Sequence, residues 1–187
     1  MEGLHEVAKA GNVAKVKELV EEGGVPVDLR DSQHWTPLIE SSYEGQAEVV
    51  VTLIDLGADV NAVNDVGFSA LTRASRQGHL EIVKILAAKG ANIHHRAAAG
   101  NSALMFAAMS DRLPVCEFLL SLGADLMAVN DANESPITQY GIGCTPALSP
   151  EVKAQRCAAL EAAWAEGPHP SQVQRRLLGK GPWAAQN

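Results

Sequence analysis

The sequence predicts an all-α solenoid of stacked helix pairs, and three observations lead to that prediction. A Gly-Ala-Asp motif at Gly57 recurs as Gly-Ala-Asn at Gly90 and as Gly-Ala-Asp at Gly123, each step being 33 residues. Hydroxyl residues recur with the same spacing at Thr36, Ser69, Ser102 and Ser135. Aromatic residues make up only 4% of the chain, a balance that suits closely stacked helices with small side chains. A fixed period of about 20–50 residues is typical of repeated units rather than of one globular core.

Each repeat is expected to contain a hairpin-like loop, an inner helix, a short turn and an outer helix. The four recurring hydroxyl residues are of the type that best caps a helix N-terminus. Gly45 and Gly78 follow the inner helices, where a left-handed residue ends a helix, and Asp111 takes that place one repeat later. Apolar residues one turn apart, such as Val49 and Leu53, predict the buried side of each outer helix.

The repeats are predicted to occupy residues 1–140, as four repeats and a degenerate fifth. The spacing between the first and second repeats is 34 residues instead of 33, so one extra loop residue is expected at Gly23 and Gly24. A loop at 141–148 is followed by a predicted C-terminal capping helix at 149–166. Cys157, Leu160 and Trp164 share one face of that helix and are expected to cover the last repeats. A basic tail at 167–187 completes the chain.

The repeated motif resembles the ankyrin repeat. The resemblance is carried by Thr36-Pro37-Leu38, the later Gly45, the outer-helix apolar residues and the motif that begins at Gly57, and it extends over residues 1–140 of the 187. It implies helix-turn-helix units joined by β-hairpin-like loops. It also implies binding of another protein through hairpin tips and the inner-helix face, by an adaptor, an inhibitor or an assembly factor.

The positions that the resemblance assigns to partner contact hold three of the eight aromatic residues, together with arginine. Tryptophan, tyrosine and arginine are the commonest anchors of protein interfaces. The predicted partner-binding residues are Trp35, Tyr43, Glu44, Asp65, Phe68, Arg76, Arg96, Asn101 and Met109. We expect the three aromatic side chains to be largely exposed in one patch with Arg76. The alternative is that they pack along the row of hairpins.

Composition and charge argue against several other classes of protein. A formal net charge of -7 does not favour nucleic-acid binding, which needs clustered cations. The sequence has no apolar run of about 20 residues, so no membrane span is expected. Three cysteines without metal-like spacing favour a reduced compartment, the cytoplasm or nucleus. A monomer is expected.

The sequence predicts neither an enzyme nor a cofactor or metal site. His94 and His95 are adjacent, but further metal ligands are not evident near them. Residues of a nucleophile and a base do not occur at a recognisable spacing. The alternative function is that of a targeting subunit, in which the basic tail with Arg175, Arg176 and Lys180 makes the key contact.

Overall fold

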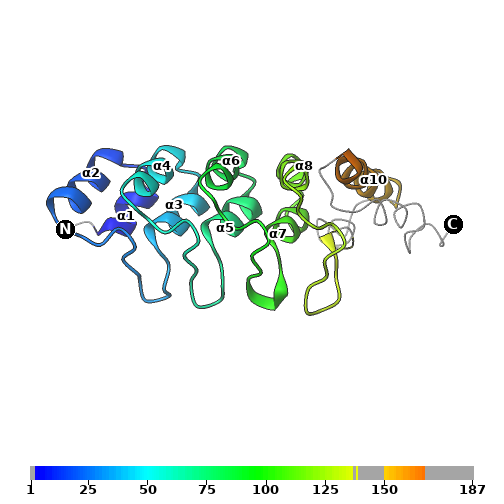
Figure 1. Cartoon of the computed structure of the whole chain (residues 1–187), viewed down its shortest axis with the longest axis horizontal. Helices are drawn as coiled ribbons and strands as arrows, with labels where there is room; N and C mark the ends of the chain where they lie inside the picture. The colour runs from blue at the N-terminus through cyan, green and yellow to red at the C-terminus, as the bar shows by residue number, and fades with distance from the viewer. Residues whose placement is uncertain (1–2, 137, 139–149, 167–187) are drawn as a thin grey trace.

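The computed structural model describes residues 3–136, 138 and 150–166, so the predicted loop at 141–148 and the basic tail at 167–187 lie outside the described residues. Two rows of helices run along the molecule, and hairpin-like loops project from the inner row (Figure 1). The inner row consists of α1 (Leu4–Lys9), α3 (Pro37–Glu44), α5 (Ala70–Gln77) and α7 (Ala103–Met109). The outer row consists of α2 (Val13–Lys17), α4 (Ala47–Asp55), α6 (Leu80–Ala88) and α8 (Leu113–Ser121). The predicted all-α solenoid is thereby confirmed.

Helices α3, α5 and α7 begin where the recurring hydroxyl residues predict. The hydroxyl oxygens of Thr36, Ser69 and Ser102 each accept a hydrogen bond from the backbone N–H three residues later, at 3.3 Å. These bonds satisfy donors that the first helical turn leaves free. Gly45 ends α3 with φ 87°, and Asp111 follows α7 with φ 58°. Aspartate tolerates this left-handed region better than most residues that carry a Cβ.

One polar side chain per repeat ties each outer helix to the inner helix of the preceding repeat. In register, Gln46 donates to the carbonyl of Lys9 at 2.9 Å, His79 to that of Tyr43 at 3.0 Å, and Arg112 to that of Arg76 at 3.4 Å. A Cβ added at Gly45 would lie 2.8 Å from the His79 ring. Glycine is therefore needed at this turn for two reasons: the backbone is left-handed, and the His79 ring of the next repeat leaves no room for a Cβ atom.

The extra residue of the first repeat lies in a helix, and its placement in the loop at Gly23 and Gly24 is wrong. Helix α2 continues into a π-helical turn, η1 (Glu18–Glu22). The backbone N–H of Gly23 donates to the carbonyl of Glu18 at 2.9 Å, the five-residue spacing of a π-turn. Such a turn takes up one more residue than an α-helical turn, so the apolar contacts on either side stay in register.

The last described helix, α10 (Pro150–Glu166), packs against α8 (Figure 1). Leu160 is fully buried in this contact, and Cys157 and Ala163 are partly buried beside it. Burial raises the pKa of the Cys157 thiol. The side chain of Trp164, also expected on this face, lies outside the described residues. Among the described helices, none combines the length and the apolar character that a membrane span requires.

Candidate functional site

Two aromatic residues are held by the hairpins at the start of consecutive inner helices. Trp35 and Phe68 are 33 positions apart, and each stands directly before an N-cap residue. The Oδ1 atom of Asp31 accepts the backbone N–H of Trp35 at 2.8 Å, and the Oδ1 atom of Asn64 accepts that of Phe68 at 2.9 Å. These hydrogen bonds close the hairpins and fix both backbones, so the two rings are presented in the same way by neighbouring repeats.

The two rings belong to an aromatic cluster, which consists of Trp35, Tyr43 and Phe68 around Arg73 of α5. The guanidinium carbon of Arg73 lies 3.9 Å from the ring centroid of Phe68, 4.3 Å from that of Trp35 and 5.5 Å from that of Tyr43. Trp35 and Tyr43 meet edge to face at 6.2 Å, and Phe68 lies 5.3 Å from Phe106 of α7. Cation–π and edge-to-face contacts of this kind hold side chains in defined positions.

The aromatic side chains are less exposed than the sequence analysis predicts. Trp35, Tyr43 and Phe68 are each partly buried, because part of each ring surface packs against Arg73 or against another ring. The guanidinium of Arg73 contacts all three rings and joins them into one surface. The positions of the aromatic residues in the sequence do not predict this contact. The part of each ring that remains exposed to solvent therefore belongs to a cluster whose side chains are already held in place.

Two hollows lie side by side on the surface between the hairpins and the inner helices, and Trp35 lines both of them. The first has a volume of about 310 Å³ and is lined by Lys9, Asp31, Ser32, Gln33, Trp35, Glu40, Tyr43 and Glu44. The second has a volume of about 340 Å³ and is lined by Ser32, Gln33, Trp35, Asn64, Asp65, Val66 and Arg73. Ser32, Gln33 and Trp35 line both hollows, so a ligand that spans the two would contact Trp35.

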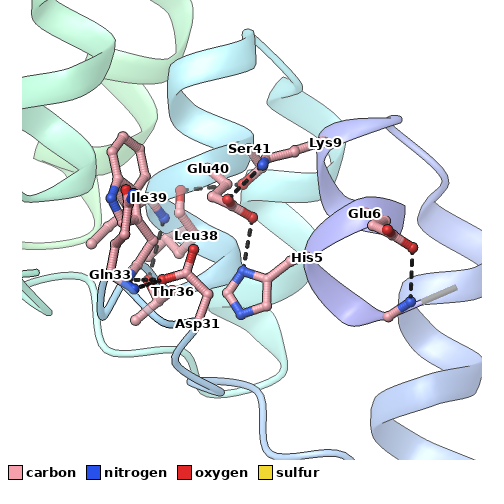
Figure 2. A network of polar contacts seen from close by, with 12 residues as sticks. His5, Glu6, Lys9, Asp31, Gln33, Thr36, Leu38, Ile39, Glu40 and Ser41 are labelled. Atoms are coloured by element: carbon pink, nitrogen blue, oxygen red, sulfur yellow. Dashed lines mark hydrogen bonds and ion pairs between the residues drawn. The ribbon is translucent and has the colours of Figure 1, made fainter.

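The floor of the first hollow contains a buried carboxylate, Glu40, which is only 4% exposed. Its Oε2 atom lies 2.8 Å from Nδ1 of His5, and its Oε1 atom lies 2.8 Å from the ammonium of Lys9 (Figure 2). The hydrogen bond to Glu40 raises the pKa of Lys9, although partial burial acts against it. A carboxylate on α3 is thus compensated by two side chains of α1, in the preceding repeat.

The same network contains the described residues that come nearest to a metal site. Ligand atoms of His5, Asp31 and Glu40 all lie within 4.8 Å of one another. However, both Glu40 oxygens already have partners, and Asp31 Oδ1 accepts two backbone N–H groups of its own hairpin (Figure 2). A metal ion would have to displace the Lys9 ammonium from Glu40. We therefore interpret the network as an ion-pair contact between repeats.

Comparison with known families agrees with this architecture. The family model for ankyrin repeats, described as three copies, matches residues 1–64 and 61–130. The chain belongs to the ankyrin repeat family. The family thus accounts for most of the described helix pairs and for the hairpins that carry Trp35 and Phe68.

Individual relatives are similar over a part of this ankyrin repeat chain. Protein phosphatase 1 regulatory subunit 27 of Homo sapiens is 42% identical over 64 residues, which are 34% of this chain and 41% of that protein. Ankyrin repeat domain-containing protein 29 of Homo sapiens is 43% identical over 54 residues, 29% of this chain and 18% of that protein. Ankyrin repeat domain-containing protein 49 of Homo sapiens is 38% identical over 56 residues, which are 30% of this chain and 23% of that protein. In each case less than half of the relative is covered.

Three further predicted contact residues surround the aromatic cluster of this ankyrin repeat protein. Glu44 is exposed and lines the first hollow, and Asp65 is exposed and lines the second, where its carboxylate contacts the ring of His34. Arg76 is exposed on the last turn of α5. Burial lowers the pKa of Arg73, and the nearby charge of Arg76 lowers it further, because the two guanidinium groups repel each other.

The remaining three predicted residues lie in the third and fourth ankyrin repeats, outside both hollows. Met109 is 41% exposed at the end of α7. Arg96 spans two hairpins by donating to the carbonyls of Gly100 and Val129, at 3.3 and 2.6 Å. Asn101 is buried, and its Oδ1 atom accepts a hydrogen bond from Asn130 at 3.0 Å. The side chain of Asn101 is therefore a link between hairpins and does not belong to the exposed surface.

Sequence reasoning missed Arg73, Glu40 and Phe106, the residues that organise the site. All three occupy one position of the ankyrin inner helix, 33 residues apart. An acid, a base and a phenylalanine at one repeat position, two residues after the position where Leu38, Leu71 and Leu104 recur, are the signal that was available. The structure gives each a separate environment: an ion-pair network, an aromatic cluster and an apolar contact with Phe68.

Proposed function

We propose that this chain is a protein-interaction module that binds a partner across the two hollows, with Trp35 as the central anchor. The observation that carries the proposal is the position of Trp35, whose backbone is fixed by Asp31 and which lines both hollows. Ordered aromatic side chains lose little conformational freedom on binding and are the commonest interface anchors. The family supports this reading, because stacked repeats present extended binding surfaces.

An adaptor or regulatory role fits the same observations. The described residues offer a surface with a few fixed aromatic and charged groups, and the hollows are shallow parts of that surface rather than enclosed cavities for a small molecule. One relative is named as a regulatory subunit of protein phosphatase 1, and regulation through a bound partner would need no chemistry of this chain's own. The alternative, a targeting subunit that uses its basic tail, concerns residues outside the described part.

Replacing Trp35 by alanine should weaken partner binding about 30-fold, because the loss of an anchor costs about 2 kcal/mol or more. The partner would first be captured by crosslinking in the source cells, and its affinity then measured with the purified chain. Lys84→Ala is the matched control, since Lys84 is exposed on outer helix α6. A thermal melt of each variant separates lost binding from lost folding.

Equal affinity of the Trp35→Ala variant and the wild-type chain would contradict the proposal. A chain that ends at Glu166 decides between the two functions. If the repeats make the contact, this truncated chain binds as well as the full one. If the tail makes it, the truncated chain loses the partner while Trp35→Ala keeps it.

A further inference from the structure

Arg73 is a partly buried cation that the described residues leave without an acidic partner. Its guanidinium is stacked between Phe68 and Trp35, and its Nε atom is buried with no hydrogen-bond partner. The ion pairs found among the described residues do not include it. Aromatic faces attract a cation, but they cannot accept the directed hydrogen bonds that a guanidinium donates.

Several other charged side chains that lie between the repeats have hydrogen-bond or ion-pair partners, unlike Arg73. Arg96 and Arg112 each donate to backbone carbonyls of a neighbouring repeat. Glu40, which occupies the equivalent position on the preceding inner helix, is compensated by Lys9 and His5. At this repeat position, therefore, the buried Glu40 is neutralised by its neighbours, whereas Arg73 lines the second hollow without an acidic partner.

The positive charge of Arg73 persists in this environment. Burial lowers the pKa of Arg73, and the neighbouring guanidinium of Arg76 lowers it further. An arginine nevertheless keeps its proton in proteins, since its ordinary pKa lies far above neutral pH. The cost of desolvating the guanidinium therefore remains in the free chain, and an anion that reaches Arg73 would offset it.

We propose, on the basis of the protein-binding function above, that Arg73 receives the carboxylate of an aspartate or glutamate side chain of the partner. A carboxylate matches the planar guanidinium because two parallel N–H···O bonds form at once. Trp35 and Phe68 hold the guanidinium in place beforehand. Val66, which is 50% exposed in the same hollow, favours an apolar residue next to the acid. The site thus selects a short acidic and apolar segment.

A library of random peptides displayed on phage, selected on the immobilised full chain, tests this inference. Enriched peptides should share an aspartate or glutamate, and the affinity of one such synthetic peptide is then measured. Arg73→Gln should weaken that affinity about tenfold or more, the effect of hydrogen bonds between charged groups. Replacing the peptide's acid by its amide should have the same effect on the wild-type chain and little further effect on Arg73→Gln, as a double-mutant cycle requires for a direct contact.

Two variants serve as controls. Lys84→Gln removes an exposed charge from outer helix α6, away from both hollows, and should change the affinity less than about threefold, because exposed charges are screened by solvent. Arg73→Lys keeps the charge without the planar group and should fall between the wild type and Arg73→Gln. Thermal melts show whether each variant is folded.

The outcomes separate this inference from the function on which it rests. Peptides that lose affinity with Trp35→Ala but have no acid dependence, and that bind Arg73→Gln as well as the wild type, would overturn the inference and leave the binding function in place. A selection without any peptide sensitive to either Trp35→Ala or Arg73→Gln would contradict both.

Discussion

Replacing both His5 and Lys9 by alanine should lower the free energy of unfolding by about 3–5 kcal/mol, the effect of leaving a buried charge without a partner. The two side chains come from α1, and they contact the two oxygens of Glu40, which is 4% exposed on α3. The double variant leaves that carboxylate buried between the first two repeats. Since each repeat is stabilised mainly by its neighbours, the first repeat should then unfold before the others.

Urea unfolding at neutral pH measures this effect, and hydrogen exchange in α1 locates it. Lys89→Ala is the matched control. It breaks the exposed contact of Lys89 with Asp55, at 2.9 Å, and should cost less than about 1 kcal/mol. Adding Glu40→Gln to the double variant should recover part of the loss, because a neutral amide is less costly to bury than an unpaired carboxylate. A double variant as stable as the Lys89→Ala control would show that Glu40 is compensated in another way.

Two neighbouring substitutions in α10 should have opposite effects on stability. Leu160 is fully buried against the fourth repeat, so Leu160→Ala should cost about 2–5 kcal/mol, as cavities in apolar cores do. The Oε1 atom of Glu161 is buried without a hydrogen-bond partner, and burial raises the pKa of this carboxyl. Glu161→Gln should therefore raise the melting temperature at neutral pH, where the carboxylate is ionised.

The stability advantage of Glu161→Gln should depend on pH. The folded chain holds a proton on Glu161 more tightly than the unfolded chain does, so the penalty of this group disappears as the pH falls through its raised pKa. The advantage of Glu161→Gln should shrink between pH 7 and about pH 4. An advantage that stays constant would show that ionisation of Glu161 is not its cause. A Leu160→Ala chain that melts like the wild type would show that α10 is an appendage rather than a cap of the repeats.

The regular part of the fold could be predicted from the sequence because it depends on local rules that repeat. The hydroxyl N-caps at Thr36 and Ser69, and the left-handed residue at Gly45, follow from hydrogen bonds within a few residues. Leu160 could be placed on the buried face of α10 by its spacing. Each of these positions is determined by its own segment of chain.

The features that the sequence did not predict correctly depend on how residues are accommodated within and between repeats. A length difference of one residue does not reveal whether a loop or the π-turn at Glu18–Glu22 takes it up. The environment of Arg73 is formed by rings from two hairpins and another helix, and Asn101 is turned toward Asn130 of the next hairpin. The family resemblance assigns partner contact to exposed positions of each repeat, and Glu40, Arg73 and Phe106 lie between those positions.

Hydrogen exchange of the full chain, with and without its captured partner, tests the central claim most directly. If the partner binds across the two hollows, exchange should slow in the hairpins that carry Trp35 and Phe68 and in the adjoining turns of α3 and α5. The outer helices α4 and α6 should exchange at the same rate in both states. Protection confined to the outer helices or to residues beyond Glu166, with the two hairpins unchanged, would contradict the account.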